Sequence, residues 1–211
     1  MATAIKDIIS DVLVDIPTLP VPLAIRHMQK AINMFFELSE SYRADYKNMN
    51  ILPQVKEYYL PLATGTRLAK PLTVTALGEK LYPTSKKLLS EEDPKYDTRQ
   101  GNPTNYYPEG FSKIVVYPTP NKLGVRDLNI EVALTYLKTT TEIQDEHAEE
   151  YLEAFTHGAL AGVYAIRGKE WTDLGLAQYH RNEFELKAQE AKAKVNGDNL
   201  AKPRIMSYGG I

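Results

Sequence analysis

The sequence has 211 residues, of which 43% are hydrophobic and 25% are charged, and its formal net charge is −2. This composition is that of a folded globular protein, and the length suits one good hydrophobic core. Tight nucleic-acid binding needs a concentrated basic face, whereas the lysines and arginines here are scattered among acids and the pI is near 6.1. The absence of cysteine excludes disulfides, thiolate zinc sites and cysteine nucleophiles.

No apolar run approaches the roughly 18–20 residues that a membrane span needs. The first residues, from Met1 to Asp7, also lack a basic segment followed by an apolar one. We therefore expect a protein that neither enters a membrane nor is secreted by a visible signal.

Two helices are predicted at the start of the chain. The first covers about Ile5 to Val14, where the apolar residues recur at helical spacing. Prolines and polar residues then interrupt the pattern. The second begins at Pro22, which suits a first helical turn because its missing N–H is unpaired there anyway, and it continues to about Tyr42. Its wide apolar stripe, which includes Phe35 and Phe36, is core material.

Between about Asn48 and Leu137 the pattern changes to that of an antiparallel β insertion. Nine of the thirteen prolines lie there, and the apolar residues form short runs separated by turn residues. The stretch from Glu91 to Glu109 is interpreted as a long loop, and loops of that length are usually functional contacts or mobile. The predicted strands are Val55 to Leu60, Leu72 to Leu77, Lys113 to Tyr117 and Leu128 to Leu137.

Helical periodicity returns after Thr139-Thr140-Thr141, a natural N-cap region, and reaches Ile166, with Gly168 placed as the C-terminal cap. A final helix is predicted from Thr172-Asp173 to Asn196-Gly197. On this helix the spacing favours ion pairs from Glu183 to Lys187 and from Glu190 to Lys194.

These elements predict an α+β fold: a helical bundle of N- and C-terminal helices, a central antiparallel β-rich insertion and an extended C-terminal tail. We assign residues 1–47 to the N-terminal helices, 48–138 to the insertion, 139–197 to the C-terminal helices and 198–211 to the tail. The tail, with Pro203 and Gly209-Gly210, cannot continue a helix, and we expect it to be mobile in the free subunit.

The sequence shows no recognisable catalytic or cofactor motif. It has no phosphate-binding loop, no G-x-S-x-G and no H-E-x-x-H pattern. Glu153 and His157 stand four apart on a helix and could share a metal, although a site needs further ligands. His180 lies on an apolar stripe, where packing is the commoner role. A metal-dependent enzyme and a nucleic-acid-associated or other soluble binding module stay open as alternatives, and no cofactor is expected.

The run His157-Gly158-Ala159-Leu160-Ala161-Gly162 is rich in small residues. In a soluble helix such a run ordinarily marks a close helix–helix crossing, and a contact between subunits is the alternative. The fourteen tyrosines suit protein interfaces. We expect Tyr96, Tyr106 and Tyr107 to be exposed in the predicted loop.

The layout resembles the head-to-tail adaptors of tailed bacteriophages, called tail tubular protein A in short-tailed phages and also known as head-tail connectors. The resemblance covers nearly the whole chain. It rests on the N-terminal helix pair Ile5 to Tyr42, on the strand and Tyr-Pro-x-Pro turn within Pro108 to Pro120, and on the strand Leu128 to Thr135. It also rests on the closing pattern from Tyr151 through Gly158 and Trp171 to Phe184.

The resemblance implies a non-enzymatic virion protein that forms a twelve-fold ring between the portal and the tail nozzle. Double-stranded DNA would pass through the ring without specific binding. The helices would dock on the portal, the β-rich part would face the nozzle, and the tail would reach into the portal as an arm. We expect assembly in the host cytoplasm and a final place in the neck of the virion.

Two groups of residues are candidates for partner contacts. In the arm, apolar anchors and a charged group suit an extended segment that adds to a groove or sheet of the portal: these are Arg204, Ile205, Met206, Tyr208 and Ile211. On the tail side the candidates are Tyr96, Tyr106 and Tyr107. The surrounding stretch from Pro83 to Pro108 departs from the family pattern, which leaves the tail partner open.

Overall fold

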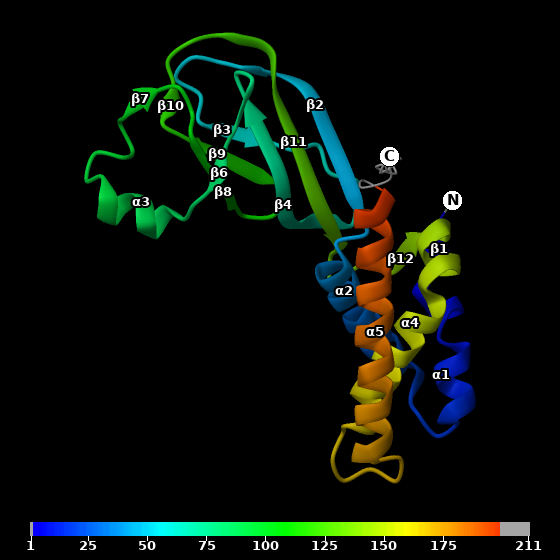
Figure 1. Cartoon of the computed structure of the whole chain (residues 1–211). Coiled ribbons are helices and arrows are strands. Elements are labelled where there is room, and N and C mark those ends of the chain that lie inside the picture. The colour runs from blue at the N-terminus through cyan, green and yellow to red at the C-terminus, as the bar shows by residue number, and fades with distance from the viewer. Residues whose placement is uncertain (1, 199–211) are drawn as a thin grey trace, which may run out of the picture.

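The computed structural model describes residues 2–198 and has the expected α+β composition. Figure 1 shows an upright group of helices with a β-rich part projecting from one end. We call the helices outside the β-rich region the helical part: η1 (Ile5–Asp7), α1 (Ser10–Asp15), α2 (Val21–Ser39), α4 (Asp145–Tyr164) and α5 (Leu174–Asp198). We call residues 43–136 the β part.

In the helical part, α2, α4 and α5 pack against one another. Their shared core is aromatic: Phe35, Phe36 and Phe155 are completely buried. The ring of Phe35 meets those of Phe36 and Phe155 edge-on, with centroids 5.4 and 5.3 Å away. This T-shaped geometry is favourable for aromatic pairs, because the positive edge of one ring faces the negative face of the other.

The close approach of the helices depends on glycines in α4. A Cβ added at Gly158 would lie 2.8 Å from the Cβ of Ala31 in α2 and 2.7 Å from the ring of Phe184 in α5. A Cβ at Gly162 would collide with the imidazole of His27. The small-residue run is therefore a helix crossing within the chain.

The helices α4 and α5 are also joined by ion pairs. Lys187 lies 2.8 Å from Glu153, and Lys194 lies 2.7 Å from Glu150. Both lysines of the predicted pairs along α5 therefore reach across to α4. These are partly exposed contacts, so each adds little to stability.

The β part contains two four-stranded sheets. In the first, the order is β2-β11-β4-β5, with β11 antiparallel to both long neighbours. Its strands are β2 (Arg43–Ile51), β4 (Thr66–Ala76), β5 (Glu79–Lys80) and β11 (Gly124–Tyr136). The second has the order β3-β9-β8-β6. Its strands are β3 (Glu57–Tyr59), β6 (Tyr82–Pro83), β8 (Asn105–Glu109) and β9 (Lys113–Tyr117).

Strand β11 links the two parts. Leu128, Ile130, Val132 and Leu134 are buried on one face, as their alternation predicts. Near its end the other face is covered too, and the hydroxyl of Thr135 donates a buried 3.1 Å hydrogen bond to the carbonyl of Asn33 in α2. One core cluster runs through both parts.

Several predicted boundaries were wrong. The first helix is divided, because the chain leaves η1 at Asp7 and restarts as α1 at Ser10. The predicted boundary between residues 47 and 48 falls inside β2. This strand was missed because its sequence shows little alternation of apolar and polar residues, and only Ile51 in it is buried. The domain division itself stays a prediction.

The cap predicted at the threonines was also wrong. Residues 142–144 form a strand, β12 (Glu142–Gln144), that pairs with β1 (Ala2–Ala4). The N-cap of α4 is therefore Gln144, which makes no side-chain cap hydrogen bond. Gly168 lies beyond the end of α4, in the loop to α5, where its φ of +74° suits glycine.

The stretch from Glu91 to Glu109 is not one long loop. Helix α3 (Lys86–Glu92) enters it, and β7 (Gln100–Gly101) and β8 lie inside it. Strand β7 runs parallel to β10 (Thr119–Pro120), and β8 pairs with β9 on one side and β6 on the other. Prolines and short lengths hid these strands, because neither segment is long enough to show alternation.

Candidate docking and assembly surfaces

The predicted portal arm begins where α5 ends, beside the start of β2 (Figure 1). The candidate arm residues lie outside the described residues: Arg204, Ile205, Met206, Tyr208 and Ile211. The structure does describe the contacts that fix the last turns of α5. These contacts determine the position from which the arm starts.

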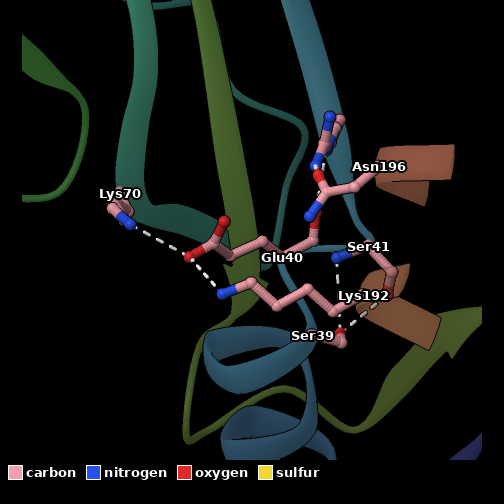
Figure 2. Close-up of polar contacts among 7 residues, drawn as sticks. Ser39, Glu40, Ser41, Lys70, Lys192 and Asn196 are labelled. Carbon is pink, nitrogen blue, oxygen red and sulfur yellow. Dashed lines mark hydrogen bonds and ion pairs between the residues drawn. The ribbon is translucent and has the colours of Figure 1, made fainter. Parts of the chain in front are cut away.

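Glu40 is at the centre of a polar network between the helical part and the β part (Figure 2). It ends α2 in a left-handed conformation, with φ of 53°. One oxygen of its carboxylate accepts hydrogen bonds of 3.0 Å from Lys70 of β4 and of 3.0 Å from Lys192 of α5. Burial by itself would raise the pKa of the Glu40 carboxyl, but hydrogen bonds from Lys192 and Lys70 lower it below its ordinary value.

Arg43 makes the second set of links. Its Nε donates to the carbonyl of Glu40 at 3.1 Å, and a terminal nitrogen donates to the Oδ1 of Asn196 in α5 at 2.7 Å. Its other terminal nitrogen lies 3.4 Å from Glu131 of β11. We call these six residues the junction cluster: Glu40, Arg43, Lys70, Glu131, Lys192 and Asn196. The cluster ties the last turns of α5 to the end of α2 and to three strands.

The junction cluster was not predicted from the sequence. Its members come together only through folding, since Lys192 and Glu40 are 152 positions apart. The sequence signal available was the polar break Ser39-Glu40-Ser41 at the end of an apolar stripe. In the structure the hydroxyls of Ser39 and Ser41 lie 2.8 Å apart and brace that turn.

The tail-side tyrosines are less exposed than expected. Tyr106 and Tyr107 lie in β8 and are buried, and Tyr96 is half-buried against a small cluster formed by Leu89, Tyr107 and Val115. The prediction of exposure was wrong because β8 is a paired inner strand rather than a loop. Their contact with a tail partner stays a prediction.

Asp93 and Asp97 hold the segment around Tyr96 in place. The hydroxyl of Tyr117 donates to Asp93 at 2.7 Å, and Arg99 pairs with the same carboxylate at 2.6 Å. Lys56 pairs with Asp97 at 3.2 Å. This outer end of the β part is therefore an ordered surface.

One histidine of α4 and one of α5 form a packed pair. The Nδ1 atoms of His157 and His180 are 2.8 Å apart, and the ring of Tyr164 stacks on His180. Burial, together with the nearby His157, lowers the pKa of His180. Glu153 pairs with Lys187 and lies 3.9 Å from the Nε2 of His157. Between residues 2 and 198 there is no group of three His, Asp or Glu side chains that could hold a metal ion.

Two grooves flank the outward side of α2. One, of about 540 Å³, lies between α2 and the ends of β4 and β11 and is lined by Arg26, Asn33, Arg67 and Lys138. The other, of about 410 Å³, lies between α2, α4 and α5 and is lined by His27, Gly158, Gly162 and Arg181. Lys30 and Met34 border both grooves.

In the described stretch 2–198, no helix combines the length and the apolar character that crossing a membrane requires. No protein with a curated description matches the chain. One family model, described as SU10 adaptor protein, matches residues 1–206 and so covers almost the entire sequence. The chain therefore belongs to the SU10 adaptor protein family and is a bacteriophage head-to-tail adaptor.

Proposed function

We propose that this protein forms a ring in the neck of the virion, where it joins the portal to the tail nozzle and continues the channel for double-stranded DNA. The observation that carries the proposal is the family match over residues 1–206. A twelve-fold ring, assembled in the host cytoplasm, is the arrangement that we expect. The role is structural, and it needs neither a catalytic site nor a cofactor.

The division of the chain into two parts supports this role. A connector needs two different ends, one for each neighbour, and here the helical part and the β part project in different directions (Figure 1). In our proposal the helices of segments 1–47 and 139–197 face the portal. Segment 48–138 faces the nozzle, with the ordered surface around Tyr96 at its outer end.

The arm is the proposed means of attachment to the portal. Residues 198–211 combine apolar anchors with basic groups, which suits an extended segment that binds by main-chain hydrogen bonds and alternate side chains. The junction cluster supports this proposal, because Lys192 and Asn196 fix the end of α5 from which the arm departs. A fixed starting point lowers the entropy that an arm loses on binding.

Deletion of all residues after Lys202 tests the arm. We expect the melting temperature of the free subunit to stay nearly unchanged, while stable attachment to heads that carry the portal of the same phage is lost. Sedimentation of heads with bound subunit measures attachment. A matched control replaces residues 203–211 by a glycine-serine segment of equal length, which keeps the reach but removes the anchors, and it should fail as well. If the truncated chain binds the heads as tightly as the full chain, docking lies on the helical part alone.

A further inference from the structure

The groove between α2 and the ends of β4 and β11, which we call the α2 groove, is rich in cations without partners. Arg26, Lys30 and Lys138 line it, and none of the three forms an ion pair with another residue of the 2–198 range. Arg67, also in the groove, is paired with Glu37. The groove therefore has a positive charge that the described part of the subunit does not neutralise.

Asn33 adds a second, independent feature of the α2 groove. Its residue exposure is only 6%, and its Nδ2 donates to the carbonyl of Gln29 at 3.1 Å. Its Oδ1 has no hydrogen-bond partner among the described residues. A buried acceptor without a donor is costly, and such groups are rare in folded proteins. The groove thus has an unused acceptor beside its unpaired cations.

The ridge of α2 beside the groove is apolar. Met34 is 53% exposed and borders the groove, and Leu38, one turn further along, is 46% exposed. Apolar area at the centre with charges at the rim is the usual composition of a protein–protein interface. A surface made for DNA phosphates would have more cations and would not expose these side chains.

Acidic side chains without an ion-pair partner lie elsewhere on the helical part. Asp7 and Asp11 are exposed on η1 and α1, and Glu146 and Glu149 are exposed on the first turns of α4. None of the four is ion-paired with a residue of the described chain. Helix α1 packs on α4, with Asp15 of α1 near Tyr164 at the C-terminal end of α4, so the four acids are spread along the length of the helical part. In Figure 1, α1 and the first turns of α4 lie to the right, whereas the C-terminal half of α2 lies to the left, nearer the β part. We call these four residues the acidic side.

We propose that the α2 groove of one subunit binds the acidic side of the next copy, and that this contact builds the ring. A ring made by rotation needs a heterologous interface, in which two different surfaces of the same chain are complementary. A basic groove and an acidic side at different places on the helical part meet that requirement. Two α2 grooves facing each other would instead repel. The inference rests on the proposed ring and adds the surfaces that form it.

Two charge-reversed variants test the contact. The groove variant carries Arg26→Glu and Lys30→Glu, and the acidic-side variant carries Asp11→Lys and Glu149→Lys. All four positions are exposed, so both chains should fold with melting temperatures close to that of the original chain. On portal-bearing heads, we expect each variant alone to form at least tenfold fewer closed rings, counted by the mass of the assembly released from the heads.

Mixing the two variants in equal amounts provides the decisive measurement. The groove variant has two acidic surfaces and the acidic-side variant has two basic ones, so alternating subunits satisfy every contact and close a ring with an even number of copies. Ring formation should return in the mixture. A matched control, Lys80→Glu with Lys122→Glu, makes the same change in net charge on exposed positions of the β part and should form rings like the original chain.

Each other result has a separate meaning. If either reversed variant alone assembles like the original chain, or if the mixture stays unassembled, the proposed contact is wrong. If the control fails as completely as the groove variant, net charge rather than the groove is responsible, and the proposal is also wrong. If the groove variant keeps the ring but loses binding to a short DNA duplex, the groove is a DNA surface. If the original chain forms no ring on heads, the proposed function itself fails.

Discussion

His157 and His180 share a hydrogen bond between their Nδ1 atoms, 2.8 Å long, across the contact of α4 and α5. Only one of the two nitrogens can supply the proton, so the pair is compatible with at most one charged ring in this geometry. The packing of Tyr164 and Tyr179 around His180 leaves little water to stabilise a second charge.

This pair predicts a loss of stability in mild acid. Burial lowers the pKa of His180 below its ordinary value of 6.5, and His27 and His147 are lowered by burial as well. As the pH falls, the histidines therefore take up protons in the unfolded chain before they do so in the folded one. The stability of the folded state that these neutral histidines provide above pH 6.5 is lost as the pH falls through their folded pKa values. The melting temperature should decline below that pH. In His180→Gln the decline should be shallower, and an equal slope in both proteins would contradict this assignment.

Truncation of the buried aromatics should be severe. Phe36→Ala and Phe155→Ala should each lower the free energy of unfolding by about 3–5 kcal/mol, because both rings are fully buried. That is a large share of a typical total of about 5–15 kcal/mol. Urea titration measures the loss. Phe111→Ala is the control, since Phe111 is 67% exposed and should change stability by less than about 0.5 kcal/mol. Losses at Phe36 and Phe155 as small as that of the control would disprove the packing.

A single added methyl group tests the crossing of α2 and α4. Gly158→Ala places a Cβ 2.8 Å from the Cβ of Ala31, which belongs to a short side chain that cannot rotate away. Overpacking of this kind costs about 1–3 kcal/mol. Gly197→Ala, on α5, meets no atom within 4 Å and should be neutral or slightly stabilising. The changes in melting temperature caused by the two variants should therefore differ in sign or by several degrees. Equal changes would mean that α2 and α4 are further apart than in the structure.

Neutralising Glu40 should loosen the end of α5. Glu40→Gln keeps the size but removes the charge that Lys70 and Lys192 share. We expect only a small change in melting temperature, because both lysines are more than a third exposed and solvent screens them. Backbone amides in the last two turns of α5 should exchange hydrogen faster. Glu79→Gln, at an exposed site on β5, is the control. Unchanged exchange near Asn196 would show that Arg43 alone holds the helix.

The elements with strong periodicity were predictable from the sequence. Strand β9 has the ends that its apolar run indicates, and the buried face of β11 follows its alternation. Helix α5 begins within two residues of its expected start at Thr172-Asp173, and His180 and Phe184 lie on its buried stripe. In these segments the spacing of apolar residues agrees with the burial in the folded protein, so the same pattern identifies both the element and its buried face.

The remaining elements depend on partners that are distant in sequence. Strand β2 is mostly polar and is a strand because β11 pairs with it. Glu153 and His157 have the helical spacing at which two side chains could share a metal. In the structure, Lys187 of α5 pairs with Glu153, and His180 of α5 hydrogen-bonds with His157. The junction cluster likewise joins five elements: α2, β2, β4, β11 and α5. No single stretch of sequence contains the information that assembles such sites.

The order of elements along the chain has a consequence for synthesis on the ribosome. The apolar stripe of α2, which includes Phe35 and Phe36, is completed by α4 and α5, and these helices emerge only after the whole β part. Strands β2 and β4 can pair with β11 once the chain has been made as far as residue 136. Strand β1 can pair with β12 only after residues 142–144 have been made. We therefore expect the β part to fold first, while the face of α2 that packs on α4 and α5 stays exposed. The helices should close around Phe35 only when the last third of the chain has been made.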